Sequence, residues 1–159
     1  MFSKGRKLVV ALLVLLCVLT LGFIWGNSLR SRSESQEQSR ALLRAVEPVV
    51  EFITGRELDA EDDLWLRKTA HFLEFGLLGA ELSLLMAALR RYGVQSLCNC
   101  LFAGLLAAVI DEYIQVFSGR GSQLSDVLLD FSGVAAAAVC VFLVCRALRG
   151  ARERKRPGG

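Results

Sequence analysis

The sequence predicts an all-α bundle of four transmembrane helices, and three observations lead to this prediction. The chain has 159 residues, of which 53% are hydrophobic, and this length favours one domain, residues 1–159. Its apolar residues are gathered into blocks of about the 20 residues that a helix needs to cross a bilayer. Basic residues flank these blocks in a pattern that orients them across a membrane. The predicted spans are 8–25, 69–89, 94–117 and 124–147.

The distribution of basic residues predicts that both termini are cytoplasmic. If the N-terminus is inside the cell, three segments are cytoplasmic: residues 1–7, the turn 90–93, and the tail 148–159 together with the end of the last helix. The only acidic residue in these segments is Glu153. Such an excess of Lys and Arg marks the cytoplasmic side. Anionic lipid explains a basic tail joined to an apolar helix, so we expect no nucleic-acid partner. These basic residues are Lys4, Arg6, Lys7, Arg90, Arg91, Arg146, Arg149, Arg152, Arg154, Lys155 and Arg156.

The first apolar block differs from a cleaved signal peptide. It follows a basic start but extends beyond the roughly 7–15 apolar residues of a signal peptide, and no clear A-x-A site follows it. We therefore expect an uncleaved first helix over 8–25.

The cysteines give little support to a disulfide or metal framework. Cys17, Cys98, Cys100, Cys140 and Cys145 make an odd count, which argues against a complete set of disulfides. The pair Cys98 and Cys100 has a spacing that could suit a metal, but we favour packing as small, buried apolar side chains.

The segments between the spans differ in character. We expect an outer loop over 26–68, in which 40–53 is either a helix on the membrane surface, broken or kinked at Pro48, or a solvated connector. The acidic run 59–63 suits the approach to the N-terminus of the second span, with a cation-binding loop as the weaker alternative. The Gly/Ser run 118–123 predicts a tight hairpin between the last two spans.

Ionisable residues inside the predicted spans form one stripe on each of three helices. Arg67, His71 and Glu74 are four and three residues apart, and Asp111 with Gln115 and Asp126 with Asp130 are each four apart, so each set shares a helix face. Charges inside a membrane are costly and face the protein interior or water. Topology brings the three stripes to the outer end, which predicts a polar pocket open to the outside. The candidate site residues are Arg67, Lys68, His71, Glu74, Asp111, Glu112, Gln115, Arg120, Asp126 and Asp130.

The same residues carry a resemblance to the VanZ-like family. The runs 67–75 (RKTAHFLEF), 111–120 (DEYIQVFSGR) and 125–130 (SDVLLD) are similar to three motifs of that family in order and spacing. The chain has Asp130 where the family often has Asn, so the resemblance does not transfer a metal-ligand role to this position. The resemblance implies a multi-pass protein of the bacterial cytoplasmic membrane with a role in the cell envelope. The family's namesake is linked to resistance to teicoplanin, a lipid-tailed glycopeptide.

One hypothesis for this pocket is an enzyme, a hydrolase or transferase acting on a lipid-linked envelope substrate. His71 suits general acid or base chemistry, and Glu74, Asp111 or Glu112 could orient it or exchange its proton. A phosphate could be held by Arg67, Lys68 and Arg120. The substrate-binding set also includes Gln115, Asp126 and Asp130. A divalent metal is a variant of this hypothesis, with candidate ligands Asp111, Glu112 and Asp126 and with His71 as a further one.

Two other hypotheses need no catalysis. The pocket could bind membrane lipids, a lipid-linked cell-wall precursor or a lipoglycopeptide without reaction. Alternatively, the charges could be ion pairs that hold the bundle together, with Arg120 paired to Asp111 or Asp126 and Lys68 paired to Glu112, although buried pairs often add little stability. A transporter is less favoured, because the chain has few helices and shows no inverted repeat.

Overall fold

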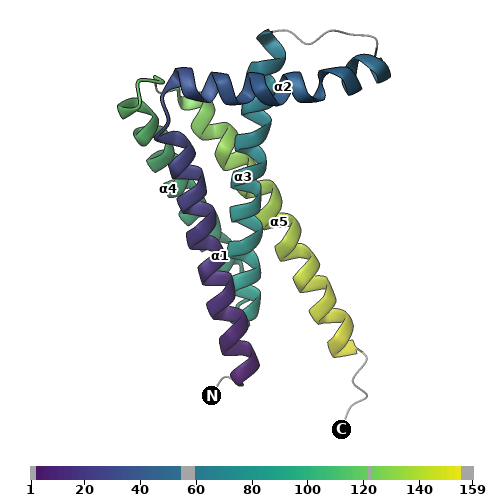
Figure 1. The fold of residues 1–159 in the computed structure, drawn as a ribbon. Helices are drawn as coiled ribbons and strands as arrows, with labels where there is room; N and C mark the ends of the chain where they lie inside the picture. The colour runs from purple at the N-terminus through teal and green to yellow at the C-terminus, as the bar shows by residue number, and fades with distance from the viewer. Residues whose placement is uncertain (1–2, 55–59, 122, 155–159) are drawn as a thin grey trace.

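The computed structural model describes residues 3–54, 60–121 and 123–154, and over these residues the chain is helical apart from short turns (Figure 1). The helices are α1 (Lys4–Ser28), α2 (Arg32–Thr54), α3 (Ala60–Ala88), α4 (Val94–Phe117) and α5 (Leu124–Arg154).

Four of these helices are long and apolar enough to cross a membrane, which confirms the predicted fold class. The candidate spans are Lys4–Ser28, Leu64–Ala88, Val94–Phe117 and Leu124–Arg152. The third agrees with its predicted bounds, whereas α3 begins nine residues before the predicted 69 and α5 continues beyond 147. The predicted bounds followed the apolar blocks, which are interrupted by charged residues such as Arg67, Lys68 and Arg146. Charged side chains do not interrupt backbone hydrogen bonding, so the helices extend past the apolar blocks.

Helix α3 lies at the centre of the bundle and packs against α5, α1 and α4. The core consists of buried side chains such as Ile24, Phe75, Leu78 and Val134. Many large apolar side chains face outwards, among them Leu15, Phe102 and Leu143. This distribution is expected of a bundle whose surface lies in lipid.

Glycines bring α3 and α5 into direct backbone contact. A Cβ atom on Gly79 would lie 2.4 Å from the Val134 carbonyl oxygen, and one on Gly133 would lie 2.3 Å from the Phe72 carbonyl oxygen. The Ser83 hydroxyl also donates a hydrogen bond to the Ala138 carbonyl, at 3.1 Å. Small residues and polar contacts of this kind hold helices together where lipid removes the usual hydrophobic driving force.

Helix α2 lies across one end of the bundle, opposite the beginning of α1 and the end of α5 (Figure 1). We call these the α2 end and the terminal end. The surface helix predicted over 40–53 is part of α2, which runs through Pro48 without a break. In the first turn of α2, the exposed Glu34 carboxylate accepts hydrogen bonds from the backbone N–H and hydroxyl of Ser31, at 2.9 and 2.8 Å, and these lower the pKa of Glu34.

The predicted outer loop 26–68 is therefore largely helical. Residues 60–63 of the acidic run form the beginning of α3, as their position before the second span predicted, and Asp59 lies outside the described residues.

The turn between α4 and α5 is tight, as predicted. Gly119 and Gly121 have φ angles of 73° and 77°, a region that residues with a Cβ rarely adopt.

The cysteines are free thiols. The packing interpretation is confirmed for Cys100, which is 2% exposed, and is wrong for Cys98, which lies exposed on the outward face of α4. The two residues are only two positions apart, so a helix cannot turn both towards its neighbours.

Candidate functional site

Three helices bring their polar stripes together at the α2 end. His71 of α3, Asp111 of α4 and Asp130 of α5 each lie six or seven residues inside the nearest end of their span. At a rise of about 1.5 Å per residue, all three side chains are rooted roughly 10 Å from those ends. The sequence prediction that these stripes meet at one depth agrees with this arrangement.

His71 lies between two buried carboxylates. Its Nδ1 atom is 3.9 Å from Asp111 Oδ2 and 3.7 Å from Asp130 Oδ1. Asp111 and Asp130 are 0% and 1% exposed, while the His71 side chain is 18% exposed. The imidazole is therefore the part of this cluster that reaches the pocket surface.

The buried carboxylates of Asp111 and Asp130 make few hydrogen bonds. Gln115 Nε2 donates to Asp111 Oδ2 at 2.8 Å from one turn further along α4. Asp111 Oδ1 and both carboxylate oxygens of Asp130 are buried without a hydrogen-bond partner. Such atoms are uncommon in protein interiors, and each costs about 1–3 kcal/mol.

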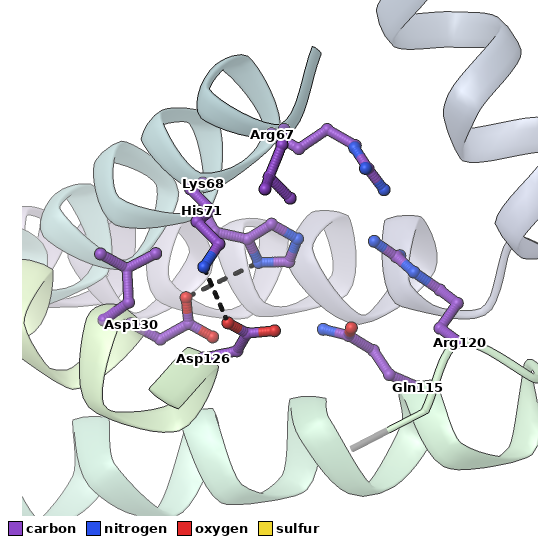
Figure 2. A pocket seen from close by; sticks show the side chains of 9 residues that line it. Arg67, Lys68, His71, Gln115, Arg120, Asp126 and Asp130 are labelled. Carbon is purple, nitrogen blue, oxygen red and sulfur yellow. Dashed lines mark ion pairs between the residues drawn. The ribbon is translucent and has the colours of Figure 1, made fainter. Parts of the chain in front are cut away.

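The guanidinium groups of Arg67 and Arg120 lie across the pocket from Asp130, whereas the Lys68 amine lies near the acidic side chains (Figure 2). Lys68 Nζ pairs with Asp126 Oδ1 at 3.6 Å. Arg120 belongs to the turn between α4 and α5, and both burial and the charge of Arg67 lower the pKa of its guanidinium. The two guanidinium groups are thus close enough to repel each other.

Glu112 holds the turn that carries Arg120. Its Oε1 atom accepts a hydrogen bond of 2.6 Å from the Gln123 backbone N–H. The Arg120 backbone N–H in turn donates to the Gln115 carbonyl at 3.1 Å. Glu112 is 3% exposed, and its described hydrogen bond fixes the turn beside the pocket.

Two neighbouring cavities adjoin this cluster. The first, the inner pocket, has a volume of about 70 Å³ and lies between α3, α5 and the end of α4 (Figure 2). Its lining residues are Leu64, Arg67, Lys68, His71, Gln115, Arg120, Asp126, Leu129 and Asp130.

The second cavity, the lateral groove, has a volume of about 300 Å³ and lies between α1, α2 and α3. Arg67, His71 and Arg120 line both cavities. The remaining lining residues of the groove are Asn27, Arg30, Ser35, Gln38, Ser39, Leu42, Leu66, Ala70 and Glu74.

The structure distributes the predicted site residues over these features. Arg67, Lys68, His71, Gln115, Arg120, Asp126 and Asp130 surround the inner pocket, and Asp111 lies beneath His71. Glu74 instead lines the groove, where it hydrogen-bonds to Asn27.

The structure brings together only part of the candidate metal ligands. Among the described residues, the ligand atoms that lie within 4.8 Å of one another belong to His71, Asp111 and Asp130. The candidates His71 and Asp111 are therefore in this group, and the candidates Glu112 and Asp126 are not. Glu112 is turned to the hairpin and Asp126 to Lys68. Helix periodicity alone could not distinguish Asp126 from Asp130, because both lie on one face.

The polar wall supplied by α2 was not predicted. Ser35, Gln38 and Ser39 line the groove, and the Arg30 guanidinium hydrogen-bonds to Gln38. The available signal was the polar run after the first span together with the apolar residues at helical spacing that follow it, but no rule of spacing fixes where such a helix lies.

The family model described as VanZ/LLP1 matches residues 8–145. The chain belongs to this family. The matched region contains every residue of both cavities, and family membership and the four apolar helices agree on a multi-pass membrane protein. The comparison with curated proteins returned no match, and neither did the comparison with solved structures.

Proposed function

We propose that this VanZ-like protein binds the phosphate-bearing head group of an envelope lipid or lipid-linked glycan. The observation that carries the proposal is the position of Arg67 and Arg120, which line both the inner pocket and the lateral groove. A phosphate placed between them would be within reach of two guanidinium groups at once.

The repulsion between the two arginines favours an anion placed between them. Burial lowers the pKa of Arg120 and so does the like charge of Arg67, whereas Asp111, Glu112 and Asp126 raise it. A phosphate between the two guanidinium groups would replace their repulsion with attraction. Guanidinium groups bind phosphate in a bidentate manner, with short, charge-assisted hydrogen bonds. Lys68 contributes less to the proposal because it lines only the inner pocket, where it pairs with Asp126.

The lateral groove has the size and lining that a lipid head group requires. Its volume of about 300 Å³ is at the lower end of the range for small-molecule sites. Polar residues of α2 face it from one side, and Leu42, Leu66 and Ala70 add apolar surface. We expect the phosphate to sit at the arginines and the first part of the lipid body to follow these apolar side chains.

The proposed location is the outer face of the bacterial cytoplasmic membrane. Lys4, Arg6, Arg90, Arg91 and Arg152 belong to helix ends or turns at the terminal end. The positive-inside rule then assigns the terminal end to the cytoplasm and the α2 end to the outside.

Catalysis at the same pocket is a second candidate function. The favouring observation is that His71 Nδ1 lies within 4 Å of two carboxylates, while the same side chain lines both cavities. An imidazole can accept or give up a proton near neutral pH. Conversion of a bound lipid phosphate that His71→Gln abolishes would support a hydrolase or transferase, and binding without product would support a non-catalytic binder.

The arginine proposal is tested by lipid binding in native mass spectrometry. Phosphatidic acid is compared with diacylglycerol, which has the same tails and no phosphate. We expect phosphatidic acid to bind, and Arg67→Ala or Arg120→Ala to weaken it by about tenfold or more, equivalent to about 1.4 kcal/mol for each guanidinium contact. Arg91→Ala is the matched control, because Arg91 is exposed at the terminal end. Equal binding by all variants, or equal binding of both lipids, would contradict the proposal.

A link to glycopeptide resistance is part of the same proposal. A protein that holds a lipid-linked cell-wall precursor, or the antibiotic itself, changes what teicoplanin can reach. We expect expression in a susceptible strain to raise the inhibitory concentration of teicoplanin, and Arg67→Ala to reverse that increase. An unchanged inhibitory concentration at verified expression would remove resistance from the proposed function.

A further inference from the structure

We infer that His71, Asp111 and Asp130 form a binding site for one divalent transition-metal cation, with Zn²⁺ and Mn²⁺ as the matching ions. Each residue offers one ligand atom, and the three atoms lie within 4.8 Å of one another. They come from three different helices, so the tertiary structure assembles the site.

The spacing of the donor atoms is close to what such an ion requires. Zn²⁺ binds imidazole nitrogen and carboxylate oxygen at about 2.0–2.2 Å, which places tetrahedral ligands roughly 3.4 Å apart. His71 Nδ1 is 3.7 Å from Asp130 Oδ1 and 3.9 Å from Asp111 Oδ2. These two distances need to contract by only a few tenths of an ångström, and the two carboxylate oxygens, which lie within 4.8 Å of each other, would close the rest of the gap by side-chain rotation.

The hydrogen-bonding state of the carboxylates is an independent observation that points to a ligand. Asp130 is 1% exposed, and neither of its carboxylate oxygens has a hydrogen-bond partner. Asp111 is 0% exposed, and its Oδ1 atom also lacks one. A divalent cation would satisfy these oxygens and offset the cost of burying two negative charges side by side.

Pairing with His71 alone does not account for the cluster. A protonated imidazole carries one positive charge and can neutralise one of the two carboxylates. Lys68, which lines the inner pocket with Asp130, pairs with Asp126. A divalent ion matches the charge of both acids, while His71 remains neutral as a metal ligand.

The chemistry of the donors selects the class of ion. Imidazole nitrogen suits Zn²⁺, and the two carboxylates suit Mn²⁺ as well, whereas Ca²⁺ and Mg²⁺ prefer oxygen ligands throughout. Gln115 would act from the second layer, because its amide holds Asp111 Oδ2 at 2.8 Å. Three protein ligands leave coordination positions open, and the inner pocket of about 70 Å³ adjoins them.

The metal site itself is independent of the proposed function, and only the role that we give the ion, which is to help bind the lipid phosphate, rests on it. A cation at the floor of the inner pocket would offer a positive charge to the same phosphate that Arg67 and Arg120 hold. Ion binding and lipid binding depend on different residues, so the two can fail separately.

The test measures metal content and affinity in the full-length protein. The protein is stripped with a chelator, placed in nanodiscs of phosphorus-free glycolipid, and titrated with Zn²⁺ by calorimetry and with Mn²⁺ by electron paramagnetic resonance. We expect one ion per chain, and a loss of affinity of about 10–100-fold or more in Asp130→Asn and in His71→Ala. Glu81→Gln is the matched control, since it changes a buried carboxylate of α3 that is hydrogen-bonded to Thr20 and belongs to neither cavity.

Three outcomes would overturn the inference. They are the absence of Zn²⁺ and Mn²⁺ binding in the wild type, equal affinities in wild type, Asp130→Asn and His71→Ala, and an equal loss in Glu81→Gln. Because a variant can misfold, bound Mn²⁺ in the wild type is also examined for coupling to imidazole ¹⁴N, which His71 coordination predicts and adsorption to carboxylates or glycolipid does not. Phosphatidic acid binding that persists in metal-free protein would leave the arginine proposal standing while the metal inference fails.

Discussion

Glu112 shows how a single side chain can position a binding residue without touching the pocket. It is 3% exposed and accepts a 2.6 Å hydrogen bond from the Gln123 backbone N–H. Arg120 lies between these two positions in the chain, in a turn with two glycines at positive φ. Glycine adopts such angles freely and leaves the turn few conformational restraints, so the turn needs an anchor, and the carboxylate supplies it.

We therefore expect Glu112→Ala to lower stability by about 1.5–3 kcal/mol, the usual contribution of a hydrogen bond to a charged group. Thermal unfolding in detergent measures the change, and phosphatidic acid binding should weaken with it because Arg120 loses its fixed position. Glu112→Gln keeps an oxygen acceptor and should recover most of the loss. If the Ala and Gln variants unfold at the same temperature, the anchoring role is wrong.

At the scale of the helices, the site depends on how closely α3 and α5 approach. Gly79 and Gly133 leave no room for a Cβ atom against the facing backbone. Because backbone atoms cannot rotate away as side chains do, an added methyl group must separate the helices. That separation would move His71 of α3 away from Asp130 of α5, whose side chains now lie 3.7 Å apart.

Gly133→Ala should accordingly destabilise the protein by about 1–3 kcal/mol, the usual cost of overpacking. Gly22→Ala is the matched control, because a Cβ atom on Gly22 meets nothing within 4 Å, and alanine favours a helix over glycine by about 1 kcal/mol. Unfolding temperatures in one detergent compare the two variants. A Gly133→Ala protein as stable as the Gly22→Ala protein would show that the tight α3–α5 contact does not hold the bundle together.

At the scale of the whole molecule, the proposed function depends on the orientation of the bundle. The beginning of α1, the end of α5 and the turn between α3 and α4 lie at the terminal end and carry basic residues, whereas α2, which lines the lateral groove, lies at the opposite end (Figure 1). Only a pocket that faces outwards can meet an envelope lipid or an antibiotic from outside the cell.

Accessible cysteines test this orientation. Glu37 of α2 and Arg91 of the turn at the terminal end are both exposed. In intact cells, a membrane-impermeant maleimide should label Glu37→Cys, whereas Arg91→Cys should react only after permeabilisation, with the wild type giving the background from its own cysteines. The reverse pattern would place the pocket in the cytoplasm.

Hydropathy and helical spacing were enough to predict the four spans and the polar stripes. Both are local properties of the chain: a helix crosses the membrane because its backbone must be hydrogen-bonded internally there, and residues three or four apart share a face. The positions of His71, Asp111 and Gln115 were predicted in this way, and the structure brings them together.

Other features depend on geometry between helices, which spacing does not contain. The rotation of α5 against α3 is set by the glycine contacts, and it directs Asp130 to His71 and Asp126 to Lys68. The placement of α2 over the groove likewise depends on contacts far apart in the sequence. The sequence therefore places Asp130 only in the substrate-binding set, whereas in the structure its carboxylate lies beside His71 and Asp111.

The most direct test of phosphate binding at Arg67 and Arg120 is the distance between the phosphorus of the bound lipid and the guanidinium nitrogens. Protein with ¹⁵N-labelled arginine is embedded in phosphorus-free glycolipid with one equivalent of phosphatidic acid, and ³¹P–¹⁵N couplings are recorded by solid-state NMR. Bidentate binding predicts a P–N distance of about 4 Å, and a coupling that Arg67→Gln and Arg120→Gln each reduce. A coupling that both variants leave unchanged, or no coupling in the wild type, would contradict a phosphate site at these arginines.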